Sequence, residues 1–164
     1  MKAIIMAGGK GTRLSPEKPL LEVCGTPMIL RVYSFARSLT DEVYVATIKG
    51  HVVDEKLGRL LKVVYTDGRG YEEDVVQAVR TVGFPALVLP SDTPFLSWDD
   101  VKPLFECKSS ICTLLSRGRF VGVSLWRSDN LRDYSSVEVE KEVINVNTPD
   151  DLAKANILCK ERIL

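Results

Sequence analysis

The sequence predicts an α/β fold of three layers, in which helices cover both faces of a mostly parallel β-sheet. Short apolar runs alternate with segments of helical periodicity along most of the 164 residues. Glycine and proline separate many of these segments, as they do between the strands and helices of βαβ units. No internal repeat and no linker is evident, so we expect a single domain over residues 1–164.

Each apolar run predicts a strand, and each segment with apolar residues three or four apart predicts a helix. Strands are expected at 2–7, 42–48, 62–66, 85–90, 111–116, 120–126 and 142–146. Helices are expected at 26–39, 51–61, 71–82, 97–106 and 149–162. Ser97 and Thr148 each precede acidic residues and predict helix starts. The apolar stripe of 149–162 predicts a helix that docks on the sheet, and 117–141 is the least regular stretch.

The composition is that of an ordinary globular protein, with 45% hydrophobic and 27% charged residues. The formal net charge is zero, so no overall field attracts nucleic acid. No apolar run approaches the roughly 18 residues that a membrane span needs, and the apolar start is too short for a secretory signal. We therefore expect a cytoplasmic protein that acts on small molecules as a monomer or a homodimer.

The cysteines and the single histidine exclude several kinds of site. Four cysteines are scattered along the chain without a C-x-x-C pair, so we expect no zinc site. The spacing of Cys107 and Cys112 permits a disulfide, but a reducing cytosol favours free thiols. His51 opens a polar helical segment and is interpreted as a surface or capping residue. One histidine cannot form a multi-histidine metal site.

A glycine-rich loop with basic residues follows the first apolar run. It reads Ala7-Gly8-Gly9-Lys10-Gly11-Thr12-Arg13-Leu14 and is followed by Glu17-Lys18-Pro19. Successive N–H groups in such a turn suit phosphate oxygens, and the cations of Lys10, Arg13 and Lys18 can surround a polyphosphate. The spacing matches neither the P-loop nor the dinucleotide fingerprint. The loop predicts chemistry on a nucleoside triphosphate; the alternative is a strand-to-helix connection with solvated cations.

These residues resemble the signature of the MobA-like nucleotidyltransferase superfamily, which makes nucleotide-sugars and nucleotide-cofactors. Two further segments resemble the archaeal adenosylcobinamide-phosphate guanylyltransferases. They are Asp67-Gly68-Arg69-Gly70-Tyr71-Glu72-Glu73-Asp74 and Ile144-Asn145-Val146-Asn147-Thr148-Pro149-Asp150-Asp151-Leu152. Molybdopterin guanylyltransferases carry similar first and last motifs, so the middle segment favours the cobinamide enzyme. The resemblance implies a Rossmann-like sheet of the nucleotide-diphospho-sugar transferase type, and transfer of GMP from GTP to adenosylcobinamide phosphate with release of pyrophosphate.

The resemblance also implies a set of site residues. Arg13, Lys18 and Asp92 are expected to be catalytic, with Arg13 on phosphate oxygens and Lys18 over the α-phosphate. The nucleotide is expected to contact Ala7, Gly8, Gly9, Lys10, Gly11, Thr12, Arg13, Lys18, Asp67, Gly68, Arg69, Gly70 and Tyr71.

Mg²⁺ is the expected cofactor. Asp92 follows the apolar run 85–90, and ligands of open α/β sheets bind beyond such strand ends. The alternative for Asp92 is a turn before proline. Asn145 is the favoured second ligand, although Asn147 lies on the same face of the expected strand. Asn147 and Gly122 are placed on the acceptor side, and Asn147 can instead support the helix cap.

The segment 67–74 is expected to select the base. A carboxylate or backbone carbonyl groups can accept from guanine N1–H and N2–H, and a backbone N–H can donate to O6. Glu73 or Asp74 can serve there, or can simply stabilise a helix N-terminus. Arg69 and Tyr71 can stack on the base or contact the acceptor.

Three other functions stay open. They are guanylyl transfer to molybdopterin, nucleotidyl transfer to a sugar phosphate, and nucleotide binding without turnover. The short chain leaves little room for a sugar-binding extension. The intact set of Arg13, Lys18 and Asp92 favours an enzyme over a non-catalytic module.

Overall fold

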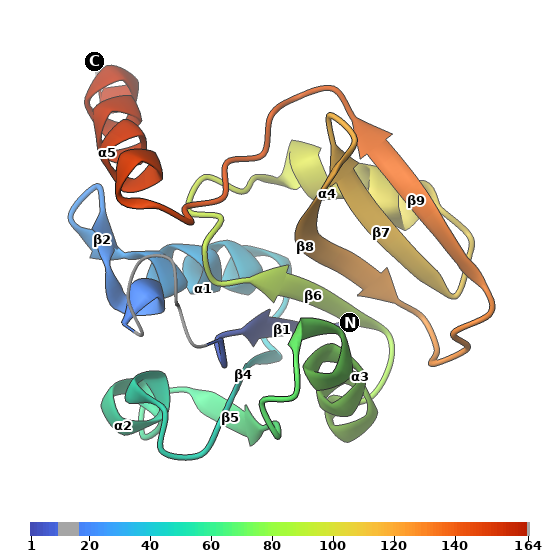
Figure 1. The fold of residues 1–164 in the computed structure, drawn as a ribbon. Coiled ribbons are helices and arrows are strands. Elements are labelled where there is room, and N and C mark those ends of the chain that lie inside the picture. Colours follow the sequence, from blue (N-terminus) through green and yellow to red (C-terminus); the bar gives the residue numbers. More distant parts are fainter. Residues whose placement is uncertain (10–16, 164) are drawn as a thin grey trace.

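The structure, a computed structural model, describes residues 1–9 and 17–163 and is built on a seven-stranded sheet of order β5-β4-β1-β6-β8-β7-β9 (Figure 1). The strands are β1 (Lys2–Met6), β4 (Val43–Thr47), β5 (Lys62–Tyr65), β6 (Ala86–Pro90), β7 (Ile111–Ser116), β8 (Arg119–Trp126) and β9 (Tyr134–Val139). β8 runs antiparallel to β6 and β7, and the other neighbouring pairs are parallel. The mostly parallel α/β sheet expected from the sequence is confirmed.

Helices cover both faces of this sheet. They are α1 (Met28–Leu39), α2 (Val52–Leu57) and α4 (Trp98–Glu106) on one face, and α3 (Tyr71–Val82) on the other. Side chains alternate along the strands, so Ile5 joins the cluster with α1 while Ile4 joins the cluster with α3. Strands buried on both faces read as continuous apolar runs. Within the described residues, no helix is long and apolar enough to cross a bilayer.

A smaller unit stands beside the sheet. It contains the short helix η1 (Lys18–Leu20), the strands β2 (Glu22–Val23) and β3 (Thr26–Pro27), and α5 (Pro149–Ile163). An apolar cluster joins α5 to β2 through Val23, Met28, Val146, Ala155 and Cys159. The expectation that this last helix docks on the sheet is wrong, because periodicity identifies an apolar face but not its partner.

The last strand is not where the sequence analysis places it. Residues 142–146 form no strand, although Val143 and Val146 are buried. Their N–H groups donate to Ser116 Oγ and to the Asp92 carbonyl, both at 2.9 Å, so the run is buried without a strand partner. β9 instead arises from the stretch that reads as irregular. It is an edge strand whose side chains alternate between partly buried and exposed, so it lacks a continuous apolar run.

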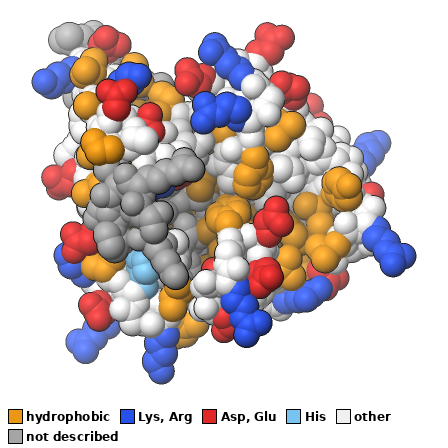
Figure 2. All heavy atoms as spheres, in the orientation of Figure 1, with side chains coloured by type: hydrophobic (Ala, Val, Ile, Leu, Met, Phe, Trp, Pro, Cys, Tyr) orange, Lys and Arg blue, Asp and Glu red, His pale blue; other side chains and the backbone are white. Residues whose placement is uncertain are grey.

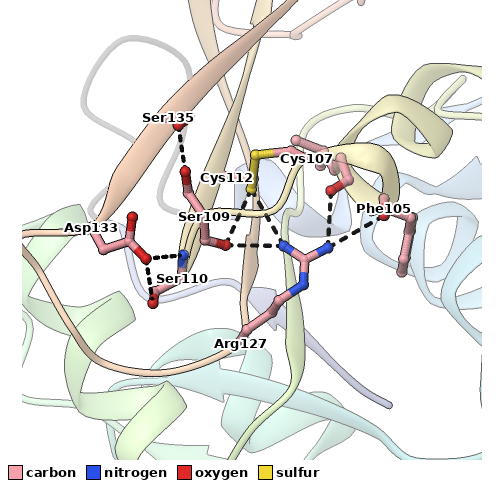
Figure 3. The surroundings of a disulfide bond; sticks show 9 residues. Phe105, Cys107, Ser109, Ser110, Cys112, Arg127, Asp133 and Ser135 are labelled. Carbon is pink, nitrogen blue, oxygen red and sulfur yellow. Dashed lines mark hydrogen bonds between the residues drawn. A yellow bond between two sulfur atoms is a disulfide. The ribbon is translucent and has the colours of Figure 1, made fainter.

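The four cysteines are paired, which corrects the expectation of free thiols. Cys24, between β2 and β3, is bonded to Cys159 of α5, with Cα atoms 5.4 Å apart. Cys107 and Cys112 link the end of α4 to β7, with Cα atoms 6.3 Å apart. The Arg127 guanidinium lies against this second disulfide and donates to the last carbonyl groups of α4 (Figure 3). The first pairing spans 135 positions, which no local spacing reveals.

Candidate active site

Two loops leave the sheet at the same edge. Met6 of β1 lies opposite Pro90 of β6 in a parallel pair, so the chain after each strand emerges side by side. The loops that contain Gly8–Gly9 and Asp92 therefore share the edge at which open α/β sheets bind their ligands.

Lys18 lies at the centre of a polar cluster on this edge. Its Nζ donates to Asp92 Oδ2 and to Asn147 Oδ1, both at 2.8 Å. The Asn145 amide donates to Asp92 Oδ1 at 2.9 Å and to the Val121 carbonyl at 3.2 Å. The side chains of Lys18 and Asp92 are only 19% and 14% exposed, so the pair is shielded but still open to a ligand. Four residues predicted as site residues are thus brought together.

Asn147 is positioned by the start of α5. Its N–H and that of Thr148 donate to Asp151 Oδ2 at 3.0 and 3.1 Å, and the Asp151 N–H donates to Thr148 Oγ1 at 3.1 Å. This reciprocal arrangement is a capping box and confirms Thr148 as the N-cap. Burial acts to raise the pKa of Asp151, but the hydrogen bonds from Asn147 and Thr148 and the Lys154 charge lower it overall.

A hollow of about 360 Å³ joins the first glycine loop to the segment 67–71. Its lining residues are Met6, Gly8, Gly9, Gly68, Arg69, Gly70, Tyr71 and Asp74. Gly68 has φ +73°, which favours glycine, and a Cβ there would lie 2.6 Å from Cδ1 of Ile48, the residue that also lies against Gly8. The two motifs expected to bind the nucleotide therefore face one cavity.

Asp74 has a role that the sequence did not reveal. Its side chain is buried, and Oδ1 accepts from the N–H groups of Gly68 at 3.1 Å and Arg69 at 3.3 Å. The Asp67 N–H is held in turn by Gln77 Oε1 at 3.0 Å. Asp74 and Gln77 of α3 thus hold the shape of the base-side loop. An acid three or four residues into a helix after glycines is the local signal that could have suggested this.

Tyr71 connects the hollow to Gly122 of β8. Its hydroxyl donates to the Gly122 carbonyl at 2.6 Å. Burial of the hydroxyl, and then the negative charge of Asp92, raise the pKa of Tyr71 far above its ordinary value, so it remains a donor. Gly122 has φ +89°, and a Cβ there would lie 3.0 Å from Pro90 Cβ. The close approach that this strand glycine indicates is made by Tyr71 and Pro90 of the same chain.

A second, apolar hollow of about 490 Å³ adjoins the first at Tyr71. It lies on the face of β7, β8 and β9 beside α3, and its lining includes Phe120, Trp126, Leu131 and Tyr134. Phe120 is 53% and Tyr134 70% exposed. Figure 2 shows hydrophobic side chains gathered on this side of the molecule. A large apolar group can therefore be bound next to the hollow that the two glycine loops line.

The remaining predicted residues of the first loop, Lys10, Gly11, Thr12 and Arg13, lie outside the described residues. In the described part of the chain, no group of three or more His, Cys, Asp or Glu side chains is arranged to hold a metal ion. The other oxygen atoms near Asp92 that could bind a metal ion belong to amide side chains. His51 accepts from the Val53 N–H at 3.1 Å, which confirms it as a helix cap.

A glycine-rich loop and a lysine–aspartate cluster at the carboxyl edge of this sheet are the arrangement expected of a nucleotidyltransferase. Residues 3–147 match the family model of the MobA-like NTP transferase domain, and the chain belongs to this family. Its fold is that of the nucleotide-diphospho-sugar transferases.

Three relatives illustrate the similarity. The chain is 28% identical to adenosylcobinamide-phosphate guanylyltransferase of Methanocaldococcus jannaschii, over 98% of each chain. It is also 28% identical to a probable molybdenum cofactor guanylyltransferase of Pelotomaculum thermopropionicum, over 96% of this chain and 92% of that one. The solved structure of molybdopterin-guanine dinucleotide biosynthesis protein A from Archaeoglobus fulgidus shares the fold, with a TM-score of 0.76 and 18% identity over 98% and 100% of the two chains.

Asp151→Asn is expected to lower the stability of the protein by about 1 kcal/mol at pH 7, because a charge-assisted cap is lost. Folding lowers the pKa of the Asp151 carboxyl below its unfolded value of 3.8. Such a carboxylate stabilises the native state fully at pH values above 3.8, and this contribution is lost as the pH falls through the lower, folded-state pKa. The difference between wild type and variant should therefore shrink from pH 7 to pH 3 in denaturant titrations.

Asp150→Asn is the matched control, because it removes a charge from the same turn without touching the cap. An equal loss in both variants, or a gap that widens in acid, would contradict this account of Asp151.

Proposed function

We propose that this nucleotidyltransferase transfers GMP from GTP to adenosylcobinamide phosphate and releases pyrophosphate. The observation that carries the proposal is the hollow lined by Gly8, Gly9 and 68–71, which lies at the same edge of the sheet as the Lys18–Asp92 pair. It supports a nucleotide with its base on the second loop and its phosphates toward the cluster. The relative from Methanocaldococcus jannaschii, matched over nearly its whole length, supports the acceptor.

Lys18 is the residue best placed to act on the α-phosphate. A lysine ammonium has three N–H donors, and two of them bind Asp92 and Asn147. The third has no hydrogen-bond partner among residues 1–9 and 17–163, and we assign it to a phosphoryl oxygen. The fixed ammonium would stabilise the charge that grows on that oxygen in the transition state. Lys10 and Arg13, together with the N–H groups of Gly11 and Thr12, are proposed to hold the other phosphates.

The residues around Asp92 fit Mg²⁺, which usually takes one or two carboxylates, waters and substrate phosphates. Asp92 supplies the carboxylate. Asn147 already directs its Oδ1 at a cation, whereas Asn145 directs its amide nitrogen at Asp92. This geometry favours Asn147 as the second ligand and Asn145 as the residue that orients Asp92, the reverse of the order expected from the sequence. When bound, Mg²⁺ would neutralise phosphate charge.

The transfer itself is an in-line displacement. A phosphate oxygen of the acceptor attacks the α-phosphorus, a new P–O bond forms, and the bond from the α-phosphorus to the bridging oxygen breaks. The bridging oxygen takes the electron pair and leaves in pyrophosphate. The chain contributes position and charge, so no covalent intermediate with a side chain is needed.

The segment 67–71 is proposed to recognise guanine. Asp74 is occupied with its own loop, so the backbone carbonyl groups of this loop are better candidates to accept from guanine N1–H and N2–H. Arg69 lines the same hollow and can lie over the base. Glu73 is exposed in the first turn of α3 and is assigned to the helix terminus.

The apolar hollow beyond Tyr71 is proposed to hold the ring system of the acceptor, and Gly122 is connected to it through the hydrogen bond from Tyr71. A corrinoid presents a large, partly apolar surface, which suits the exposed aromatic side chains there. Transfer to molybdopterin is the second candidate, because the relative from Pelotomaculum thermopropionicum is equally similar in sequence.

Residues 1–164 are proposed to act as one domain, as a monomer or a homodimer in the cytoplasm. The two disulfides are uncommon for a cytoplasmic protein, because disulfides inside cells are common chiefly in hyperthermophiles.

Incubation of the protein with GTP, Mg²⁺ and adenosylcobinamide phosphate should release pyrophosphate, measured by a coupled assay. Parallel reactions contain molybdopterin or glucose 1-phosphate. Lys18→Ala and Asp92→Asn should each reduce the rate by about 10²–10³, whereas exposed Lys102→Ala should not change it. Release with molybdopterin instead would transfer the assignment to that acceptor, and near-normal rates in both variants would reject the catalytic cluster.

GTP with Mg²⁺ should raise the melting temperature more than ATP, CTP or UTP at the same concentration. Binding to the native state alone stabilises it in proportion to affinity, and only guanine offers the donor pattern that the loop carbonyl groups accept. Differential scanning fluorimetry provides the measurement, and equal shifts with all four nucleotides would remove the guanine assignment.

Phe120→Ala should raise the KM for adenosylcobinamide phosphate about tenfold and leave the KM for GTP unchanged, because an apolar contact on the order of 1–2 kcal/mol is lost. Leu60→Ala is the control, since Leu60 is 78% exposed and outside the hollow. A matching rise in the KM for GTP would show that Phe120 acts on the nucleotide side.

A further inference from the structure

We propose that His51 is a positioning residue of the nucleotide site, which sets the orientation of the Gly9 peptide group. The inference rests on the proposed nucleotide site, but it adds a residue that lies outside every motif identified in the sequence. His51 sits immediately before α2, 42 positions from Gly9 in the chain.

The two ring nitrogens of His51 have different partners. Nδ1 accepts from the Val53 N–H at 3.1 Å, so it carries no hydrogen. Nε2 then carries the ring hydrogen and donates to the Gly9 carbonyl oxygen at 3.1 Å. The capping bond to α2 thus selects the tautomer that can hold the glycine loop.

Backbone hydrogen bonds fix the position of His51. Its N–H donates to the Ile48 carbonyl at 2.9 Å, and its carbonyl accepts from the Glu55 N–H at 3.0 Å. Val53, the residue that His51 caps, is completely buried in the core. Movement of the ring would therefore disturb α2 as well as the loop.

The loop is held at a second carbonyl by the same part of the chain. Thr47, completely buried at the end of β4, donates through Oγ1 to the Ala7 carbonyl at 3.1 Å. Ile48 lies under Gly8, with its Cγ1 3.4 Å from the place of a Cβ. The carbonyl groups of Ala7 and Gly9 are thus both bound by the segment 47–51.

This attachment has a consequence for phosphate binding. Binding the Ala7 and Gly9 carbonyl groups to Thr47 and His51 fixes the conformation of residues 7–9 before a nucleotide binds. Without these contacts this part of the loop would have to be ordered at the moment of binding, and that ordering weakens affinity. His51 therefore acts through the loop and needs no contact with the nucleotide.

Three variants separate this role from the helix cap. In His51→Asn the side-chain oxygen can replace Nδ1 at the cap, but nothing reaches Gly9. In His51→Gln the amide nitrogen can replace Nε2, but the side chain is a poor cap. His51→Ala removes both contacts.

We expect His51→Asn to bind GTP·Mg²⁺ about fivefold more weakly in isothermal titration calorimetry, the effect of one ordinary hydrogen bond, with an unchanged melting temperature. His51→Gln should bind GTP like the wild type but melt earlier, with faster amide hydrogen exchange in α2. His51→Ala should show both defects. In turnover, His51→Asn should raise the KM for GTP and change kcat little.

Wild-type affinity for GTP in His51→Asn, or a loss of GTP affinity in His51→Gln as large as that in His51→Ala, would overturn the proposal. Failure of the wild type to bind GTP would count against the proposed function instead. The same three variants would then be titrated with the nucleotide that gives the largest thermal shift. Weaker binding in His51→Asn and a lower melting temperature in His51→Gln would remain the criterion for His51.

Discussion

The ion pair between Lys18 and Asp92 is the contact on which the arrangement of the site depends, because its members come from distant parts of the chain. Lys18 begins η1 after the glycine loop, Asp92 follows β6, and Asn147 precedes α5, at separations of 74 and 129 positions from Lys18. The Val146 N–H adds a bond to the Asp92 carbonyl at 2.9 Å. The edge of the sheet and the unit beside it meet at this cluster.

Stability alone does not explain such a pair, because removing two charges from water costs about as much as their attraction returns. The chain contains a useful contrast in Asp100, which is 3% exposed and accepts from the N–H and hydroxyl of Ser97 at its own helix start. That carboxylate serves the cap of α4, and its Oδ1 also lies 3.2 Å from Lys141 Nζ, so it is paired and closed to solvent. Asp92 is paired as well, but its side chain stays 14% exposed at the carboxyl edge of the sheet, which is the arrangement expected of a group that receives a ligand.

Much of this could be predicted from the sequence, because parallel strands place their following loops at one edge. The strand runs predicted β1 and β6, and with them the shared sheet edge at which the loops of Gly8 and Asp92 begin. Contacts decided by long-range packing could not be predicted. Nothing local pairs Cys24 with Cys159 or directs His51 at Gly9, since each partner is identified only when the chain has folded.

The segment 142–146 also shows that backbone partners decided by long-range packing cannot be predicted from the sequence. An apolar run that ends in Asn predicts a buried strand, and the burial is correct for Val143 and Val146. Their backbone groups bond to Ser116 and Asp92 instead of to a neighbouring strand. Because this segment pairs with no neighbouring strand, Asn145 can turn its amide toward both Asp92 and Val121. The failed strand prediction therefore coincides with the place where the backbone is shaped for the site.

The two sides of the cluster are supported in different ways. Asp92 extends from the centre of the sheet, where Leu87 and Leu89 of β6 are completely buried. Lys18 and Asn147 belong to segments that are joined to each other, by the apolar cluster around Val146 and by the Cys24–Cys159 disulfide. Lys18 and Asn147 therefore share one support, whereas Asp92 extends from the other. The Lys18–Asp92 pair joins the two supports, together with the hydrogen bonds from Asn145 and Val146 to Asp92. Nucleotide and metal bind at that junction in the proposed mechanism, where their charges act on the Lys18–Asp92 pair.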